Sequence, residues 1–598
     1  MTDIVWKIGG PAGAGIMGAG TILGKAFTRS GNYIHIYSEY PSLVRGGHNS
    51  TQVRISESKV ESPCKKCDIL VALTGFTVQA HLHELNEGGV IINDELNKLE
   101  NVTIPSNVTL VNIPLKDLAH KNGGTDLMMN TVAMGASLAV MNYPFEYLQK
   151  IISETFERKG EQIVKVNVDC AKVGYDFVKA HNVKFTKVIK PKTSESKVIF
   201  TGNEAIGAGA IQGGLKFFSA YPMTPASSIL HFVAEQEFEH NVVVKHCEDE
   251  ISAVLMAIGS SYTGARSMTS TSGGGFALMA ESVGLSAIAE TPVTIVVSQR
   301  PGPSTGLPTW TEQGDFRFVL HSSQGDFLRL IVAPGDVGEA YNLTQKVMNL
   351  SDKYQIPAFV LSDKFLSESS TSVDLSEFKK IEIDRGELIT KDLPELAQGE
   401  RFLRYKITDS GVSPRPIPGV KGGDHVASSY EHWENGFSTE HFEMRVKMVD
   451  KRERKINGLL KEIDAPTIHG DKNAEVTLIC WGSHKPIVFE AVDMLNKEGI
   501  KANAIHFSFL HPLHPSTNDL LKNKKLIIVE NNLTAQFGGY LKEKLGVSFI
   551  GSILRYDGRP LFASEVYNNA KSIFKGETKD VVVYDKEPYE YYSTRRIE

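Results

Sequence analysis

Short apolar runs alternate with glycine-rich turns and helix-sized segments along most of the chain, and this alternation constrains the fold more than any other feature. The run 4–8 leads into a glycine-rich turn at 9–20 and a helical stretch, and 33–38 follows as a second strand. A second series starts at 198–201, before another glycine-rich stretch. Strands that alternate with helices favour βαβ units. We therefore predict an α/β protein with several domains and doubly wound, mostly parallel sheets.

The chain has 598 residues, so several domains are expected rather than one core. A polar stretch at 186–197 resembles a linker, and the periodicity of apolar residues fades from about 367 to 468. These breaks predict a first α/β domain at 1–185, a second at 196–375, an extended connector at 376–470 and a C-terminal α/β domain at 471–598.

Composition excludes some classes of function. The net charge of -6 provides no basic surface for nucleic acid and no polybasic arm for membranes. The longest apolar runs, such as 291–298, are too short to span a bilayer. The N-terminal residues lack the basic start and long apolar stretch of a signal peptide, so we expect a cytoplasmic protein.

Five cysteines are too few for a disulfide scaffold of this size. Cys64 and Cys67 have the spacing of a chelating pair, but a zinc or iron–sulfur site needs about two more ligands. None is close in the sequence, so we interpret the pair as free thiols at a turn before a strand. We predict no metal site in this chain.

The first glycine-rich turn contains a G-x-G-x-x-G pattern at Gly13, Gly15 and Gly18. It follows a strand and opens a helix, which is the setting of a phosphate-binding turn. Glu39 lies near the end of the second strand, where a ribose-binding acid would be. These features leave a nicotinamide-dependent enzyme as an alternative, although glycines also serve close packing of a helix on a strand.

The stretch Ser38–Ser50, SEYPSLVRGGHNS, followed by 53–56, resembles the signature of the γ domain of 2-oxoacid:ferredoxin oxidoreductases. Its glycines allow a sharp backbone turn at a domain contact. The resemblance marks five residues as candidates for a domain contact or for coenzyme A binding. They are Ser38, Tyr40, Arg45, Gly46 and Gly47.

The segment Tyr221-Pro222-Met223-Thr224-Pro225 resembles the Tyr-Pro-Ile-Thr-Pro motif of the same family. The two prolines stiffen the backbone on both sides of the threonine and hold its hydroxyl in one direction. Further stretches that resemble the family are 202–205, 248–250, 271–276, 300–309, 408–419 and 530–536, so the resemblance runs to about residue 545.

The resemblance implies an enzyme that depends on thiamine diphosphate and shares the cofactor between two chains. One chain supplies a carboxylate beside the aminopyrimidine ring, and the other binds the diphosphate through Mg²⁺. Glu250 is the candidate carboxylate, with Glu248 and Asp249 as rivals and an ordinary acidic helix start as the alternative. Thr271, Ser272 and Gly273 are further candidates for cofactor binding.

Arg300 ends a predicted strand, where a planar guanidinium could bind the carboxylate of a 2-oxoacid at two points. A structural salt bridge is the alternative. Some members of the family carry an arginine after Gly-Leu-Pro-Thr, where this chain has Trp310. The candidate substrate-binding residues are Tyr221, Pro222, Thr224, Arg300, Ser304 and Thr305, and we assign catalytic roles to Thr224, Glu250 and Arg300.

The resemblance also implies a reaction. It is the coenzyme A-dependent oxidative decarboxylation of a 2-oxoacid, such as 2-oxoglutarate or pyruvate, to acyl-coenzyme A and CO₂, with ferredoxin as the electron acceptor. This chain has no Gly-Asp-Gly stretch followed by a metal-binding Asn, and its cysteines cannot hold a cluster. The expected partner is therefore a β subunit that carries thiamine diphosphate, Mg²⁺ and a [4Fe–4S] cluster, in a dimer of αβ heterodimers. A non-catalytic assembly subunit is the second alternative.

Overall fold

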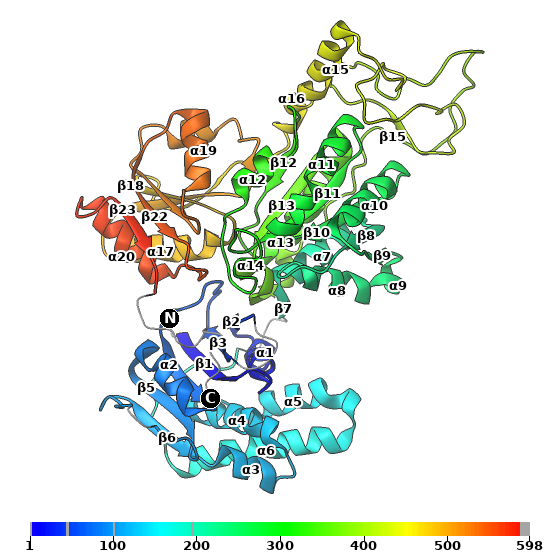
Figure 1. The fold of residues 1–598 in the computed structure, drawn as a ribbon. Coiled ribbons are helices and arrows are strands. Elements are labelled where there is room, and N and C mark those ends of the chain that lie inside the picture. The colour runs from blue at the N-terminus through cyan, green and yellow to red at the C-terminus, as the bar shows by residue number, and fades with distance from the viewer. Residues whose placement is uncertain (1–2, 43–46, 100–101, 193–196, 586–598) are drawn as a thin grey trace.

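The computed structural model describes residues 3–42, 47–99, 102–192 and 197–585. Three large sheets organise these residues, each flanked by helices (Figure 1). The N-terminal unit, the middle unit and the C-terminal unit lie beside one another, and a long arm projects from the middle unit. None of the helices in the described ranges combines the length and apolar character that crossing a membrane requires.

The first sheet has eight strands in the order β6-β5-β4-β1-β3-β2-β14-β7. Their bounds are β1 Asp3–Pro11, β2 Tyr33–Glu39, β3 His48–Ser56, β4 Cys67–Ala72, β5 Leu85–Asp94, β6 Thr109–Ile113, β7 Lys197–Thr201 and β14 Ser370–Asp374. The strand β3 runs antiparallel to both β1 and β2. This sheet is therefore mixed rather than mostly parallel, and its last two strands come from the second predicted domain.

Helices and 3-10 turns of the N-terminal unit pack beside this sheet. They are α1 Ile16–Arg29, α2 Gly75–His81, η1 Leu82–Glu84, α3 Leu115–Lys121, η2 Asp126–Met128, α4 Met129–Val140, α5 Phe145–Phe156, η3 Glu157–Lys159 and α6 Glu161–Ala180. The helix α4 is buried along nearly its whole length. Gly135 and Gly174 let α4 and α6 approach closely, because a Cβ on either glycine would collide with the backbone of the other helix.

The second sheet has seven strands in the order β20-β12-β13-β11-β10-β8-β9. Their bounds are β8 Phe217–Ala220, β9 Val243–His246, β10 Ser267–Thr271, β11 Val293–Gln299, β12 Leu330–Val332, β13 Pro357–Asp363 and β20 Phe509–His511. All the strands from β8 to β13 pair in parallel, and β20 adds one antiparallel edge. The carboxyl ends of these six neighbouring strands therefore lie at one edge.

The helices of this unit connect its parallel strands. They are α7 Gly202–Gln212, α8 Ser227–Glu235, α9 Glu237–His240, α10 Glu250–Tyr262, α11 Gly273–Ile288, α12 Phe316–His321, α13 Val337–Tyr354 and α14 Lys364–Glu368, with η4 at Leu375–Glu377. Four of them start at side-chain caps, in which Thr201, Asp249, Asp336 and Asp363 accept backbone N–H bonds.

The third sheet follows the order β17-β19-β18-β21-β22-β23 and is parallel except for β17. Its elements are β17 Thr467–Gly470, β18 Val476–Trp481, η5 Gly482–His484, α17 Lys485–Lys497, β19 Ala502–Phe507, α18 Thr517–Leu521, β21 Leu526–Glu530, α19 Gln536–Leu545, β22 Phe549–Arg555, α20 Ala563–Phe574 and β23 Asp580–Val583.

The arm between the middle and C-terminal units contains more regular structure than its sequence indicates. It holds β15 Leu388–Ile389, β16 Arg415–Pro416, α15 Phe442–Arg454 and α16 Ile456–Leu459. The helix α15 escapes a search for apolar periodicity because two of its three buried positions are Lys451 and Arg452.

Lys451, one of these buried cations, attaches the arm to the middle unit through Glu290, which lies just beyond α11 and is fully buried. The Glu290 carboxylate forms ion pairs with Lys451 Nζ at 2.5 Å and with Lys455 Nζ at 2.6 Å, and Arg404 donates to its backbone carbonyl at 2.7 Å. Lys451 and Lys455 hold the pKa of Glu290 well below its usual range despite burial. A buried charge that is paired in this way depends on its partners.

We predict that Glu290→Gln lowers the free energy of unfolding by about 3–5 kcal/mol, because the substitution leaves two buried ammonium groups without a counter-charge. Denaturant titration of the full chain measures this. Glu443→Gln, at an exposed position in the first turn of α15, is the control and should cost less than about 0.5 kcal/mol. Equal losses of unfolding free energy in both variants would contradict the role of the Glu290 ion pairs in holding the arm.

Candidate functional site

The residues that the sequence marks in the middle unit lie where parallel strands end. The strands β8, β9, β10 and β11 lead into segments 221–225, 247–250, 272–275 and 300–305. Because neighbouring parallel strands share one carboxyl edge, these segments converge there. The candidates therefore belong to a single region of the second sheet.

Glu250 is the only one of the three neighbouring acids that is buried, with 3% of its surface exposed. Its Oε1 has no hydrogen-bond partner among the described residues. Asp249 instead caps α10 by accepting the N–H of Ser252 at 2.8 Å, and Glu248 is exposed. A buried carboxylate oxygen without a partner is costly, so it indicates a position built for something other than stability.

The start of α11 packs against Glu250. A Cβ added to Gly275 would lie 2.5 Å from Glu250 Oε1 and would also collide with the Thr271 hydroxyl. Ser272 is buried, and its Oγ has no partner among the described residues although it occupies the N-cap position of α11. The glycine-rich turn thus lets the helix end approach the carboxylate, and it leaves polar atoms available beside it.

Thr224 and Arg300 meet directly, although not through the threonine side chain. Arg300 Nη1 donates to the backbone carbonyl of Thr224 at 2.7 Å, and the Thr224–Pro225 bond is cis. Arg300 is half-buried, and its Nε is buried without a partner among the described residues. Tyr221 is exposed and Pro222 is half-buried, so the segment 221–224 lies at the surface of this edge.

Asp315 is an acid near this edge that sequence reasoning missed. A Cβ on Gly273 would lie within 2.7 Å of both oxygens of its carboxylate, and its Oδ2 has no partner among the described residues. Burial raises the pKa of Asp315 to about 6 against the opposing charge of Arg300, and burial and Asp315 raise the pKa of Glu312 to about 7. The two acidic residues that follow Trp310, Glu312 and Asp315, were the signal in the sequence that could have identified this position.

The segment 301–309 forms an exposed loop beside α11. Ser304 adopts a positive φ of 56°, and its carbonyl oxygen lies 3.8 Å from where a Cβ on Gly274 would be. Ser304 and Thr305 are exposed at this loop. Trp310, where some relatives carry arginine, is 5% exposed and lies under the guanidinium of Arg559, 4.0 Å from its ring centroid.

The γ-type candidates lie at a contact between the first sheet and α14. Lys364 donates to the carbonyl of Ser38 at 2.9 Å, and Tyr40 donates to Glu368 at 2.7 Å. Burial and Glu368 raise the pKa of Tyr40. Gly47 adopts a positive φ of 86°, and its carbonyl accepts the N–H of Ala12, whereas Arg45 and Gly46 lie outside the described residues.

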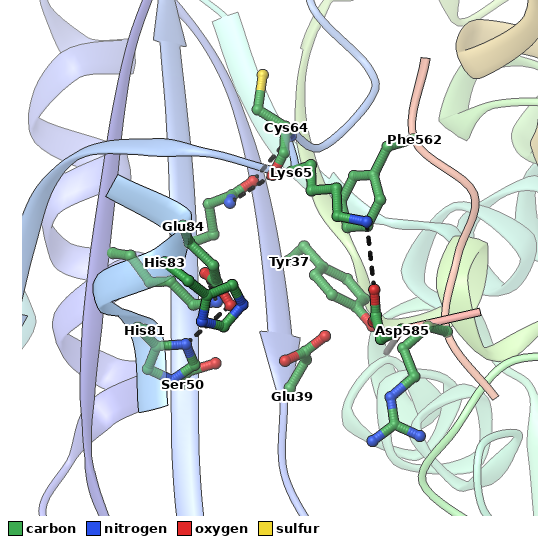
Figure 2. A pocket seen from close by; sticks show the side chains of 13 residues that line it. Tyr37, Glu39, Ser50, Cys64, Lys65, His81, His83, Glu84, Phe562 and Asp585 are labelled. Carbon is green, nitrogen blue, oxygen red and sulfur yellow. Dashed lines mark hydrogen bonds and ion pairs between the residues drawn. The ribbon is translucent and has the colours of Figure 1, made fainter. Parts of the chain in front are cut away.

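A small polar pocket of about 40 Å³ lies between the first sheet and the C-terminal unit. Figure 2 shows Glu39, His81 and Glu84 on one side and Phe562 and Asp585 on the other. This volume has room for water rather than for a coenzyme. Lys65 crosses the junction to Glu565 at 2.6 Å and to Asp585 at 3.3 Å, so the pocket belongs to a domain contact.

Cys64 lines this pocket and Cys67 begins β4. Burial raises the pKa of Cys64 to about 11 and raises that of Cys67 as well. Both thiols are free, and the described ranges contain no group of three His, Cys, Asp or Glu side chains arranged to hold a metal ion. The raised pKa values make both thiols poor nucleophiles and poor metal ligands.

The strand order of the first sheet differs from that of a dinucleotide-binding fold. There the first two strands are adjacent and parallel, which brings the acid at the end of the second close to the glycine turn. Here β3 lies between β1 and β2, so the strand that ends at Glu39 lies two strand spacings, about 10 Å, from β1. Gly15 caps α1 with a φ of 71°, and Asn130 binds the carbonyl of Ala14 beside it.

We predict opposite effects of two neighbouring substitutions on the isolated chain. Glu250→Gln should leave the free energy of unfolding unchanged or raise it by about 1 kcal/mol, since a buried amide costs less than a buried carboxylate without a partner. Asp249→Ala should lower it by about 1 kcal/mol through the lost helix cap. Denaturant titration compares them, and a loss above about 2 kcal/mol in Glu250→Gln would mark that residue as structural.

Each of the three units matches a known family model. A model described as pyruvate ferredoxin/flavodoxin oxidoreductase matches residues 5–177, and one described as pyruvate flavodoxin/ferredoxin oxidoreductase, thiamine diphosphate-binding, matches 208–451. A transketolase C-terminal domain model matches 467–542. The three matches follow the three large sheets, and the second contains the edge with Glu250 and Arg300.

Relatives match nearly the whole chain. The 2-oxoacid:ferredoxin oxidoreductase 2 subunit alpha of Aeropyrum pernix is 30% identical over 98% of this chain and 99% of its own, and the subunit alpha of Saccharolobus solfataricus is 30% identical over 97% and 99%. A solved structure of 2-oxoglutarate:ferredoxin oxidoreductase from Magnetococcus marinus, with 2-oxoglutarate, coenzyme A and succinyl-CoA bound, matches with a TM-score of 0.90 and 30% identity, covering 96% of this chain and 100% of that one. The chain belongs to the alpha subunits of the 2-oxoacid:ferredoxin oxidoreductases.

Proposed function

We propose that this chain is the alpha subunit, with fused γ-type and α-type domains, of an enzyme that oxidatively decarboxylates a 2-oxoacid to an acyl-coenzyme A and CO₂. The acceptor is ferredoxin, and the reaction takes place in the cytoplasm. The observation that carries this proposal is Glu250, a buried carboxylate at the carboxyl edge of a parallel sheet with one oxygen unpaired. Family membership supports the same reaction.

Glu250 fits the part of the cofactor site that this chain would supply. When bound, thiamine diphosphate supplies a carbon nucleophile once its aminopyrimidine ring is activated by a carboxylate. Glu250 would accept or hold the proton at the ring nitrogen through Oε1, since that atom has no partner among the described residues. Gly275 leaves room for the carboxylate, because a Cβ there would collide with Glu250 Oε1 and with the Thr271 hydroxyl, and Ser272 and Gly273 precede it at the start of α11.

Arg300 and Thr224 would bind the substrate. The guanidinium is fixed by the Thr224 carbonyl through Nη1, which leaves its other N–H groups for a carboxylate. The Thr224 hydroxyl lies on a segment stiffened by Pro222 and Pro225, and it would donate to the keto oxygen of a bound 2-oxoacid. Tyr221, Ser304 and Thr305, all exposed at the same edge, would border the substrate side chain and select among 2-oxoacids.

The remaining machinery would come from a β subunit, which the name of the relatives as subunit alpha implies. We assign to it the diphosphate-binding half with Mg²⁺ and a [4Fe–4S] cluster, and we expect a dimer of αβ heterodimers. Ser38, Tyr40, Arg45, Gly46 and Gly47 remain candidates for a domain contact or for coenzyme A. The contacts of Ser38 and Tyr40 with α14 support the first role.

The domain limits 1–185, 196–375, 376–470 and 471–598 stay a proposal, with β7 and β14 as the exceptions that belong to the first sheet. A nicotinamide-dependent reaction is a weaker alternative, because β3 separates Glu39 from the glycine turn. A non-catalytic assembly subunit would keep the same fold but would not need an unpaired carboxylate at Glu250.

We predict that Glu250→Gln in the αβ complex lowers the rate of C2 proton exchange of bound thiamine diphosphate, and turnover with it, by about 100-fold or more, because the amide cannot take up the proton. Exchange is measured by NMR and turnover with a panel of 2-oxoacids and a dye acceptor. Glu248→Gln, at the exposed neighbouring acid, is the matched control and should be near normal. Normal exchange in Glu250→Gln would place the activating group elsewhere.

A further inference from the structure

The segment 530–536 resembles the family in sequence, yet it belongs to the C-terminal unit and not to the sheet that carries the candidate site. It joins β21 to α19, and its first three residues, Glu530, Asn531 and Asn532, are buried. Buried polar side chains need hydrogen-bond partners. The partners of the two asparagines include the backbone of 311–317 in the middle unit, which follows the exposed loop of the candidate site.

The two asparagines bind this backbone directly. Asn531 donates through its side chain to the Thr311 carbonyl at 3.1 Å, and its own carbonyl accepts the N–H of Gln313 at 2.7 Å. Asn532 donates to the Gln313 carbonyl at 3.0 Å. The residues 311–315 lie in neither a helix nor a strand, so these bonds satisfy backbone groups that regular structure would otherwise pair.

Gln536, the first residue of α19, adds two bonds of the same kind. Its side chain donates to the Gly314 carbonyl at 2.6 Å and accepts the N–H of Arg317 at 2.8 Å. The Glu530 carboxylate accepts the N–H groups of the next two residues of α19, at 3.1 Å and 2.8 Å. The helix start from which Gln536 reaches the middle unit is therefore fixed as well.

The backbone that these amides hold carries Asp315 at the carboxyl edge of the second sheet. The N–H of Asp315 donates to Gln299 Oε1 at 2.9 Å, next to Arg300 in the chain, and its carboxylate occupies the space that a Cβ on Gly273 would need. Burial raises the pKa of Asp315, and the positive charge of Arg300 opposes that shift. The two opposite charges therefore interact at this edge.

Apolar contacts already join the two units at this place. The ring of Phe316 packs against Phe537 and Tyr540, with its centroid 5.5 Å from each. Hydrogen bonds add little net stability to such a contact, but they fix the direction and distance of the groups that they join. The amide bonds are therefore better suited to placing Asp315 than to holding the units together.

We propose that the segment 530–536 positions the substrate-binding edge and acts through Asp315 on Arg300. The Arg300 guanidinium donates to the Thr224 carbonyl at 2.7 Å, and the charge of Asp315 attracts the same guanidinium. These two constraints limit the directions in which its remaining N–H groups can meet the carboxylate of a 2-oxoacid. The inference rests on the proposed function, because it takes Arg300 to bind the substrate.

Steady-state kinetics of Gln536→Ala in the αβ complex test this role. The KM for the 2-oxoacid should rise by about 10-fold while kcat stays within about two-fold, because binding is weakened and the reacting groups are untouched. Asn496→Ala is the matched control. Asn496 is also half-buried in the C-terminal unit, and its side chain donates to and accepts from the backbone of Ala502, at 3.0 Å and 2.9 Å. It should lose similar stability in denaturant and leave KM within about two-fold.

A double variant tests the route through Asp315. Asp315→Asn keeps the shape of the side chain and removes its charge, so KM should again rise by about 10-fold or more. If Gln536 acts through Asp315, adding Gln536→Ala to Asp315→Asn should raise KM little further. Increases in KM that simply multiply would show that the two residues act independently, and would overturn the inference.

Hydrogen exchange of the full-length chain separates this inference from the proposed function. Gln536→Ala should speed exchange of the amides of 313–317 by about 10-fold or more, and Asn496→Ala should leave it unchanged. Normal exchange in Gln536→Ala, or an unchanged KM in an active complex, overturns the inference and leaves the proposed function standing. Faster exchange beside a wild-type complex that oxidises no 2-oxoacid overturns the proposed function and still supports the hold of 530–536 on this backbone.

Discussion

The parallel register of β9, β8, β10, β11 and β13 is the constraint on which the candidate site depends. Parallel pairing makes all five strands end at one edge, so segments separated by more than a hundred residues meet there. The short glycine-rich start of α11 then allows a helix end to approach the Glu250 carboxylate. Neither the acid nor the arginine would be placed by its own helix or loop alone.

Two buried glutamates, near the start of α10 and the end of α11, differ in how their negative charge is paired. Glu290, beyond the end of α11, forms ion pairs with two buried lysines and fixes the arm. Glu250, at the start of α10, has an oxygen without a partner among the described residues. The first arrangement stabilises the fold, and the second costs stability and suits a group that must exchange a proton. Similar burial thus serves opposite purposes.

Sequence reasoning succeeded where periodicity and local chemistry agree. The strands predicted at 4–8 and 33–38 lie within β1 and β2, and the run at 198–201 lies within β7. It failed where burial is achieved by charge, as in α15, whose buried lysine and arginine hide its inward face. It also failed for β3, because pairing with two distant strands decides that element rather than its own sequence.

Side-chain partners were a further limit. The sequence marked Thr224 and Arg300 as candidates for substrate binding, but it did not predict the hydrogen bond from Arg300 to the Thr224 carbonyl. Asp315 was missed because its closeness to Gly273 joins two segments that the fold brings together. Such contacts depend on how loops cross the sheet edge, which local sequence does not encode.

The central claim is that this chain holds the activating carboxylate while its partner holds the diphosphate and the cluster. Iron, sulfide and thiamine diphosphate analysis of the purified lone chain, beside the reconstituted αβ complex, tests it most directly. The account predicts no stoichiometric cluster and at best weak thiamine diphosphate binding in the lone chain, and both groups in the complex. A full [4Fe–4S] cluster in the lone chain would contradict it.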